Sequence, residues 1–402
     1  MADNNRNEQQ DLEQARQPQE EQEPKKTPGR GGTFLRRLGT LLVTLLIVLG
    51  ILAVSMMGDG NILDRVRRWI NYGAAAAEDA YLFAADPINQ YGQVGEYLVV
   101  LTQNYIQFLE DSGTAYQVVE ELALSQPVLD TGGGLAVAYD AGGQKLFLVS
   151  PEGTQLSLSL SEGDGYISAR LNSSGWLAVC AEKSGYKGAV TVYNGEQELI
   201  YEVDLSSQFV VDAVVTEDCR FALLMTYGEE NGAFCTNLVW YDLSAEEPVA
   251  SVSLPNHVGF DMGKIGECYG SISSQAVAFV GKDGSTSGGY VFGGQYLQDY
   301  AFGDDCIALF LTRYQSGSVG TVLTLDSQGN VLGVLDVSDE ILDIDAAGDH
   351  LAVLQSNTLV LYTSDLTEYS RLSDTSYASH VLMAEDGSAL VIGGSSAWRY
   401  LP

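Results

Sequence analysis

Four aspartates in one short stretch of the chain carry side chains of the type that binds calcium. They are Asp339, Asp343, Asp345 and Asp349, and the middle two would point to the same face of a strand. A helix–loop–helix calcium site needs oxygen ligands at alternate positions, with a glycine and a closing glutamate. The stretch DIDAAGD lacks that order. We therefore interpret these residues as turn aspartates, together with Asp164, Asp304 and Asp305, and predict no metal ligand.

Nucleophilic catalysis finds little support in the sequence. Ser184 and Lys187 match the SxxK spacing of penicillin-recognising enzymes, but that motif opens a helix and is accompanied by SDN and KTG elements. Here the pair lies in a glycine-rich hairpin loop, and both companion elements are absent. The sequence also lacks GxSxG, a P-loop, and GxGxxG in a strand–helix context. We predict no catalytic and no cofactor-binding residue, and a protein that is not an enzyme.

Histidine and cysteine do not form a metal-binding pattern. His257, His350 and His380 fall in separate repeat units, and we interpret them as surface or turn residues. The cysteines have no CxxC spacing, which argues against zinc; they are Cys180, Cys219, Cys235, Cys268 and Cys306. Cys180 ends an apolar run and is a predicted core residue. The odd number leaves at least one thiol unpaired, and spacing alone does not decide which cysteines pair.

The acidic charge of the chain is confined to its larger, C-terminal part. Residues 1–37 carry seven acidic and seven basic residues, so the whole formal net charge of −33 lies beyond residue 37. Nucleic-acid binding needs a basic surface, and this charge argues against it. We interpret the charge mainly as a source of solubility outside the cell. A more specific interpretation is the attraction of cations or basic peptides.

One segment near the N-terminus has the length and composition of a membrane span. Twenty uncharged residues run from Leu38 to Met57, and as a helix they would extend roughly 30 Å, the hydrocarbon thickness of a bilayer. We predict a transmembrane helix within residues 34–58. Residues 1–33, which are rich in Gln, Glu, Asn, Pro and Gly, form a predicted disordered cytoplasmic tail. Residues 59–80 form a predicted juxtamembrane helix or stalk.

The charges that flank this segment predict its orientation. Five basic residues between Lys25 and Arg37 precede the uncharged stretch and three follow it, which favours a cytoplasmic N-terminus and an outer C-terminal part, in a single-pass protein of the cell membrane. A cleaved signal peptide is the alternative, since Ala53-Val54-Ser55 supplies small residues for cleavage. The apolar stretch is longer than the usual 7–15 residues of such peptides, so we favour an uncleaved anchor.

Beyond residue 81 the chain repeats a β-type pattern. Short apolar runs begin at residues 98, 135, 176, 221, 276, 307, 351 and 389, about 42 residues apart, the period of a four-stranded propeller blade. Turn residues such as Gly175 and Asp386 precede the runs. The sequence predicts an all-β propeller over residues 81–402, with eight blades preferred. Seven remain an alternative, because the spacing is uneven around residues 279–305. Residues 80–85 would complete the last blade.

Two resemblances accompany this pattern. The hairpins LDSQGNVLGVLDV and FLEDSGTAYQVVEEL resemble units of quinoprotein-like propellers, but Trp176, Trp240 and Trp398 do not occupy the docking place of that family, so no quinone cofactor is implied. The layout of tail, span, residues 126–149 and residues 296–329 resembles an uncharacterised family of anchored propeller proteins of Gram-positive bacteria. That resemblance implies a fold and a topology, and no catalytic residues.

A complete fold without a catalytic constellation favours a non-enzymatic binding or scaffold module at the cell surface. We expect one propeller face to bind a protein, peptide or glycan, and the single helix to bind the lipid bilayer. Two alternatives stay open. One is a hydrolase or lyase that works in the propeller channel, which would need clustered carboxylates or a histidine there. The other is a transmembrane sensor that signals through the tail.

Overall fold

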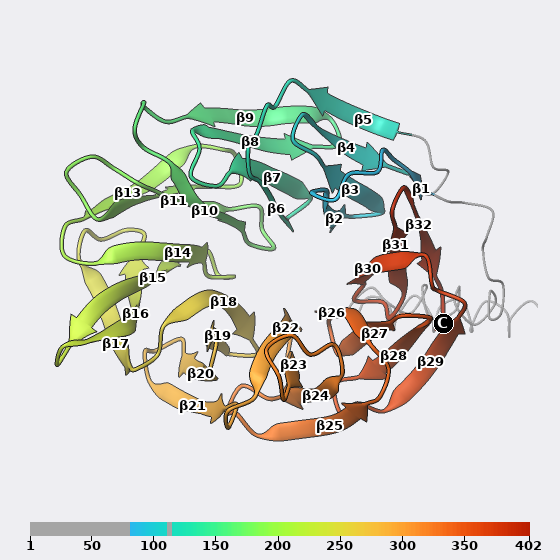
Figure 1. The fold of residues 1–402 in the computed structure, drawn as a ribbon. Coiled ribbons are helices and arrows are strands. Elements are labelled where there is room, and N and C mark those ends of the chain that lie inside the picture. The colour runs from blue at the N-terminus through green and yellow to red at the C-terminus, as the bar shows by residue number, and fades with distance from the viewer. Residues whose placement is uncertain (1–80, 111–114) are drawn as a thin grey trace, which may run out of the picture. The chain divides into compact units, whose positions relative to one another are not determined.

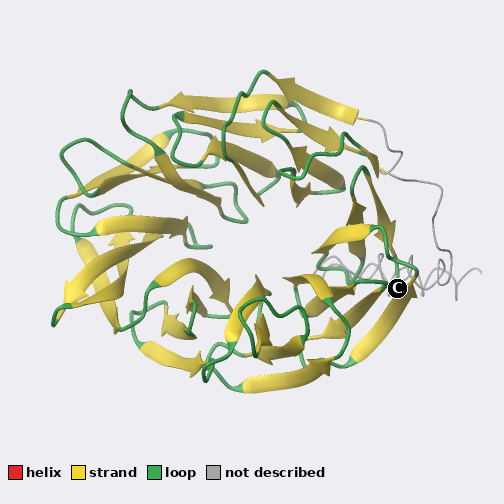
Figure 2. Cartoon of the chain, viewed as in Figure 1, coloured by secondary structure: helices red, strands yellow, loops and turns green. Residues whose placement is uncertain are grey.

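The computed structural model describes residues 81–110 and 115–402 of the chain. Every regular element in these residues is a β-strand, and none is a helix (Figure 2). No helix that would cross a bilayer is therefore found within the described ranges. The predicted tail, membrane helix and stalk, with the span ends Leu38 and Met57, lie outside the described residues.

The strands form eight antiparallel four-stranded sheets, which stand side by side around a common axis (Figure 1). This arrangement confirms the eight-bladed propeller. Blade 1 contains β2 (Gln90–Val94), β3 (Tyr97–Leu101), β4 (Tyr105–Leu109) and β5 (Ala115–Glu120). Blade 2 contains β6 (Pro127–Gly132), β7 (Leu135–Asp140), β8 (Lys145–Ser150) and β9 (Gly153–Ser159). Blade 3 contains β10 (Tyr166–Leu171), β11 (Leu177–Ala181), β12 (Gly188–Tyr193) and β13 (Leu199–Leu205).

The next four blades repeat this order, with the first strand of each nearest the axis. Blade 4 contains β14 (Phe209–Val215), β15 (Phe221–Glu230), β16 (Ala233–Asp242) and β17 (Pro248–Pro255). Blade 5 contains β18 (Gly259–Ile265), β19 (Cys268–Ser273), β20 (Ala276–Gly281) and β21 (Thr286–Val291). Blade 6 contains β22 (Tyr296–Phe302), β23 (Ile307–Thr312), β24 (Gly320–Leu325) and β25 (Val331–Val337). Blade 7 contains β26 (Ile341–Ala347), β27 (His350–Gln355), β28 (Thr358–Thr363) and β29 (Glu368–Ser373).

Blade 8 is assembled from both ends of the domain. Its first three strands are β30 (Ala378–Met383), β31 (Ala389–Gly393) and β32 (Ser396–Tyr400), and its fourth strand is β1 (Tyr81–Leu82). In the antiparallel pair, Tyr81 lies opposite Ala397. Tyr81 is fully buried in a cluster that joins Ile392 of blade 8 to Leu98 of blade 1. The prediction that the segment before the first repeat completes the last blade is confirmed, and this pairing closes the ring.

The hydrophobic core consists of layers between neighbouring blades. One layer packs Val190 of blade 3 against Leu224 of blade 4, and another packs Phe310 of blade 6 against Val353 of blade 7. The second strand of a blade is covered on both faces, which is why it appears in the sequence as an unbroken apolar run. Strand β11, which contains Cys180, is buried throughout, so the prediction that Cys180 is a core residue is confirmed.

Blade 5 explains the uneven spacing that made a seven-bladed propeller an alternative. Its apolar run, residues 276–280, is the third strand β20, whereas the run is the second strand in the other blades. The second strand β19 contains Gly270, and β18 beside it contains Gly263. A Cβ atom at Gly263 would lie 2.4 Å from the ring of Phe302 in blade 6. The glycines make room for that ring, and the strand loses its apolar signature.

Antiparallel order gives the ring two different faces. The connections from first to second strand and from third to fourth strand emerge at one end of every blade, which we call the turn face. The connections from second to third strand, and from one blade to the next, emerge at the other end, which we call the aromatic face. Gly175 and Gly348 have positive φ angles of 75° and 58° in turn-face connections, as tight hairpins require.

Candidate functional site

The inner strands carry an irregularity at the same place in six consecutive blades. Pairing of the first with the second strand shifts by one residue there, as in a β-bulge. A bulge bends the strand and redirects the side chains beside it. The residues that follow the shift are polar in each blade: Ser168, Asp212, Asp261, Asp299, Asp343 and His380. The repeated bulge therefore builds a set of polar groups on the inner strands.

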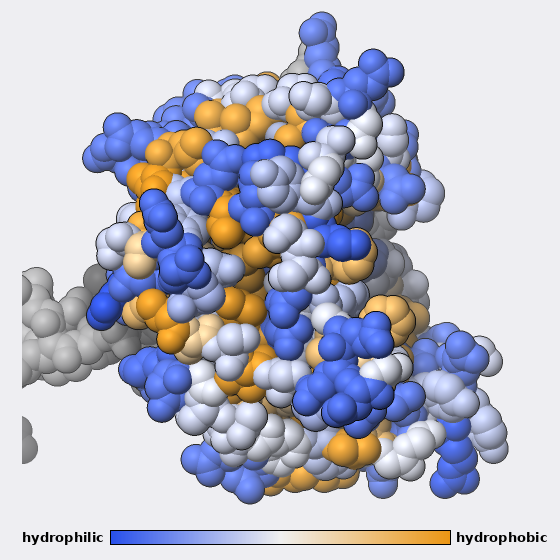
Figure 3. All heavy atoms as spheres, turned by 90° about the vertical axis from the view of Figure 1, so that its left-hand side faces the viewer, coloured by the Kyte–Doolittle hydropathy of each residue, from blue (hydrophilic) through white to orange (hydrophobic). Residues whose placement is uncertain are grey.

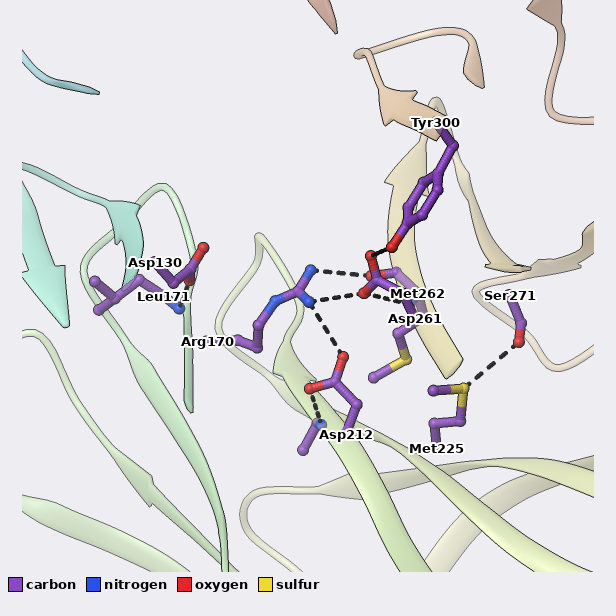
Figure 4. A network of polar contacts seen from close by, with 10 residues as sticks. Asp130, Arg170, Leu171, Asp212, Met225, Asp261, Met262, Ser271 and Tyr300 are labelled. Atoms are coloured by element: carbon purple, nitrogen blue, oxygen red, sulfur yellow. Dashed lines mark hydrogen bonds and ion pairs between the residues drawn. The ribbon is translucent and has the colours of Figure 1, made fainter. Parts of the chain in front are cut away.

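Arg170 organises the first group of these side chains (Figure 4). Its guanidinium lies 2.8 Å from the Asp261 carboxylate and 3.3 Å from that of Asp212, and it donates a further hydrogen bond of 3.0 Å to the backbone carbonyl of Met262. The three side chains come from β10, β14 and β18, so one arginine joins three successive blades. The Tyr300 hydroxyl of β22 donates to the other oxygen of Asp261 at 2.8 Å.

Burial and charge act in opposite directions in this group. Burial raises the pKa of Asp212 to about 6, although the positive charge of Arg170 lowers it. Burial works against the charged guanidinium, but the carboxylates around Arg170 hold its pKa above the usual range. Burial and the charge of Asp261 raise the pKa of Tyr300. Arg170 thus stays charged and neutralises part of the acidic group.

A second group of carboxylates lies on blades 6 and 7. Asp299 of β22 accepts a hydrogen bond of 3.0 Å from the backbone N–H of Ile344 in the next blade. Asp343 accepts one of 2.9 Å from Val381, and Asp345 accepts one of 2.7 Å from Met383. Each of these carboxylates therefore ties its inner strand to that of the following blade. Asp343 and Asp345 are strand residues, which corrects their interpretation as turn aspartates.

The second group has a histidine where the first has an arginine. The Nδ1 atom of His380 lies 3.5 Å from the carboxylate of Asp343, and the His380 ring packs 5.5 Å from that of Tyr91. The pairing with Asp343 raises the pKa of His380. Burial, followed by the charge of Asp343, raises the pKa of Asp299 to about 6, and burial raises that of Asp345 to about 7.

The inner strands do not arrange these groups as a metal site. Within residues 81–110 and 115–402, three or more acidic, histidine or cysteine side chains do not converge on any point in the way a metal ion requires. The carboxylates point instead to backbone N–H groups of the next blade. The arrangement lines the inner wall of the propeller with carboxyl groups. Most of them carry negative charge, and those with a raised pKa are partly protonated.

Exposed aromatic side chains distinguish the two faces. Seven lie on the aromatic face, each more than 40% exposed: Tyr186, Phe209, Phe234, Phe260, Tyr296, Tyr314 and Tyr377. Among the described residues, the turn face has one of comparable exposure, Tyr116 at 51%. The outer wall differs again. On the side of blades 3 and 4 that Figure 3 shows, apolar residues lie between hydrophilic ones.

The aromatic face is continuous with the inner strands. Phe260, the extra residue of the blade 5 bulge, packs its ring 5.8 Å from that of Tyr300, whose hydroxyl reaches Asp261. On the same face, the ammonium of Lys187 lies 4.1 Å from the centre of the Phe209 ring. A ligand on this face would therefore meet open rings first and carboxylates next. We take the aromatic face and the inner-strand groups as the candidate site.

The residues considered for nucleophilic catalysis do not meet. Ser184 and Lys187 lie in the connection between β11 and β12, where the Ser184 N–H donates to Asp164 and the Lys187 ammonium covers Phe209. The five cysteines are all free thiols, and Cys180, Cys235 and Cys306 are buried. The bulges were missed in the sequence. The recurrence of Asp at the third or fourth residue of strands β14, β18, β22 and β26 was the available signal.

The three histidines differ in exposure. His257 precedes β18 in a connection, but it is 7% exposed and lies 3.2 Å from the Ser271 hydroxyl. Burial lowers the pKa of His257. His350 begins β27, and His380 lies within β30 on the inner wall. The predicted surface position is therefore correct for His380, whose side chain is 51% exposed, whereas His257 lies in a connection, as predicted, but is buried.

Comparison with known proteins agrees with the fold. The model of a family described as "Family of unknown function (DUF5711)" matches residues 72–371. No relative of curated function matches the chain. Three solved structures are similar in fold. BamB from Moraxella catarrhalis is 10% identical, with a TM-score of 0.51, and the alignment covers 80% of this chain and 98% of BamB. The C-terminal WD40 domain of Sif2 is 12% identical (TM-score 0.57; 80% and 97% covered). The designed protein Ika8 is 9% identical (TM-score 0.55; 80% and 97% covered).

Proposed function

This chain belongs to the DUF5711 family of unknown function, and we propose that it is a membrane-anchored binding module whose propeller captures a partner protein on its aromatic face outside the cell. The module is not an enzyme: it presents a surface, and the ring holds that surface rigid. The likeness of fold to BamB and to the WD40 domain of Sif2 supports a propeller used for binding or scaffolding, and the residues of this chain identify the face.

The observation that carries the proposal is the segregation of exposed aromatic rings. Tyr314 is 70% exposed and Phe234 is 69% exposed, although neither ring contributes to the buried core. Aromatic side chains supply most of the contact energy in protein interfaces, because they bury a large area at a small entropic cost. Their placement on connections of several blades, within one face, is what a docking surface requires.

A photocrosslinking experiment tests the partner and the face together. A benzophenone amino acid replaces Tyr314 in the full chain expressed in its own cells, and the same amino acid replaces Tyr116 in a matched control. The proposal expects a discrete crosslinked product from the aromatic face and none from the turn face. Equal crosslinking from both positions, or none from either, would overturn it.

The anchor and the outer location rest on residues 38–57 and on the flanking basic residues. Protease added to intact wall-stripped cells should cut a tag placed after Pro402, and should leave a tag placed before Met1 untouched. Carbonate washing should leave the full chain with the membrane fraction. The reverse pattern of tag cleavage would contradict the orientation, and release of the chain by carbonate would contradict the anchor.

A second candidate function is a hydrolase or lyase that uses the inner strands. It is favoured by one observation: Asp212 and Asp299 have pKa values raised to about 6, which suits proton donors, and His380 stands beside Asp343. Turnover of any polysaccharide or peptide substrate should then fall at least a hundredfold in D299N. Unchanged turnover in D299N and D212N would remove this candidate.

A further inference from the structure

We infer that the partner of the aromatic face is a basic protein segment, whose lysine or arginine side chains lie over the exposed rings and beside the carboxylates that border them. The inference rests on the proposed function and names the chemistry of the partner. The partner segment is extended, because its side chains must reach rings that stand on the connections of different blades.

The chain itself shows how this face holds a cation. Lys187 places its ammonium 4.1 Å from the centre of the Phe209 ring. Lys183 lies 5.5 Å from the ring of Tyr186 and also bonds to Asp204 at 2.7 Å and to Glu202 at 3.0 Å. Both contacts fall within the range of about 6 Å in which an aromatic face attracts a cation. A ring beside a carboxylate is therefore already a cation-holding unit on this face.

Other rings on this face keep their own cation-free surfaces. Among the described residues, Tyr314, Phe234 and Tyr377 have no lysine or arginine over them, and they are 70%, 69% and 52% exposed. Exposed carboxylates stand on connections of this face, some of them beside the rings and two on the β25–β26 connection, and they outnumber the basic side chains there. The acids are Glu182, Glu229, Glu230, Asp339, Glu340 and Asp374, and the bases are Lys183, Lys187 and Arg313. The charge of the face thus complements a basic partner.

The inner wall extends the same complementarity. Arg170 satisfies Asp212 and Asp261, whereas Asp299 and Asp343 form no ion pair with a lysine or arginine of the described residues. Phe260 and Tyr300 connect the aromatic face to this wall. One basic side chain of the partner, directed toward the axis, would join His380 beside Asp299 and Asp343 and supply there a charge such as Arg170 supplies beside Asp212 and Asp261.

Other occupants fit the face less well. An anionic lipid surface or a nucleic acid would be repelled by the carboxylates. A neutral glycan would stack on the rings and donate hydroxyl hydrogen bonds to the acids, but it carries no charge, so its binding would depend little on salt. Each of these occupants predicts a different dependence on ionic strength, so salt separates them from a basic segment.

Fluorescence anisotropy with labelled peptides tests the inference directly. The probes are a ten-residue lysine–leucine peptide, its glutamate–leucine counterpart and neutral chitohexaose, each added to the full chain in zwitterionic nanodiscs. We expect binding of the lysine peptide alone, weakened at least fivefold between about 50 mM and 500 mM NaCl. Binding of the glutamate peptide or the glycan with equal affinity would overturn the inference.

Matched variants distinguish peptide binding at the aromatic face from attraction by the overall negative charge of the chain. The double variant F234S/Y314S keeps every charge, and it should weaken the lysine peptide about tenfold, since each exposed cation–π contact contributes roughly 0.5–1 kcal/mol. Y116S on the turn face should leave the affinity unchanged. An equal loss in Y116S, or no loss in F234S/Y314S, shows that the peptide binds elsewhere and overturns the inference. If crosslinking at Tyr314 succeeds while the lysine peptide fails to bind, the docking face stands and only its basic partner is wrong.

Discussion

The two faces of the ring are built from connections of similar length, yet they use their side chains differently. On the turn face, polar residues hold the backbone of their own hairpins. Asp326 accepts hydrogen bonds from the N–H groups of Gln328 and Asn330, at 2.8 and 2.9 Å, and Asp386 accepts one from Ser388. On the aromatic face, Tyr314 and Phe234 expose their rings without such a local task.

The difference separates residues that fold the protein from residues that are left for a partner. A turn aspartate stabilises a hairpin by satisfying backbone donors, so its carboxylate is engaged before any ligand arrives. An exposed ring contributes little to folding, because the surface that it would bury is still in water. Acidity is common to both faces, and it is the rings that distinguish them. Four sets of variants, from the largest expected effect to the smallest, examine this separation.

Removing Arg170 should have the largest effect, because the inner strands support both faces. R170M leaves Asp212 and Asp261 without their counter-charge, and we expect a loss of about 2 kcal/mol in unfolding free energy, less than for a fully buried pair because Arg170 is 30% exposed. The loss should be smaller at pH 5 than at pH 8, since protonated Asp212 no longer needs the guanidinium. Chemical denaturation at both pH values measures it, and a loss independent of pH would contradict the account.

Replacing aspartates of the turn face should have the next largest effect on stability. D326A and D386A each leave backbone N–H groups of a hairpin without their acceptor, and each should lower the unfolding free energy by about 1 kcal/mol. D326N and D386N keep an acceptor oxygen and serve as controls, with smaller losses. Thermal unfolding of the four variants gives the comparison. If D326A and D326N were equally destabilised, charge rather than hydrogen bonding would be responsible.

Replacing Asp345 should change stability in a pH-dependent way, with a sign opposite to that of R170M. Its pKa in the folded protein is raised to about 7, so the folded chain holds a proton that the unfolded chain releases near pH 4. Stability from this group is full below about pH 4 and is lost as the pH rises through 7. D345N keeps the acceptor for Met383 without the charge, and should raise the unfolding temperature at pH 7.5 by roughly 2 °C while changing little at pH 4.5. A gain of equal size at both pH values would contradict the raised pKa.

The smallest effect on stability should come from the aromatic face. Y314S and F234S remove exposed rings, and each should change the unfolding free energy by less than about 0.5 kcal/mol. Thermal unfolding beside wild type measures the change, with Y116S as the equivalent on the turn face. A loss above about 1 kcal/mol in Y314S would show that the ring packs within the fold, and the contrast between the two faces would then fail.

Much of the fold follows from local pattern in the sequence. Apolar runs at a regular period predicted eight blades, and the short last repeat predicted that the segment before residue 86 would complete it. Blade 5 departs from the pattern because Gly263 and Gly270 accommodate Phe302 from another blade. Such a close approach of residues distant in the chain leaves no periodic trace, so seven blades stayed open as an alternative to the preferred eight.

The candidate site was harder to predict, for two physical reasons. A bulge reverses the alternation of side chains along a strand, so Asp299 and Asp343 cannot be assigned to the inner wall from a period of two. The partner of Arg170 in blade 5, Asp261, is 91 residues away in the chain and meets it only when the ring is closed. Only strand direction places the exposed rings of Tyr314 and Tyr377 on one face.

The β1–β32 pair has consequences for how the domain folds during synthesis and for how it resists a pulling force. During synthesis Tyr81 leaves the ribosome long before Ala397, so the first strand must wait, unpaired, for more than three hundred further residues. Once formed, this two-residue pair is the first contact to bear a force applied at the N-terminal side of the domain. Such a force would separate β1 from β32 and open the ring before it unfolds any other blade.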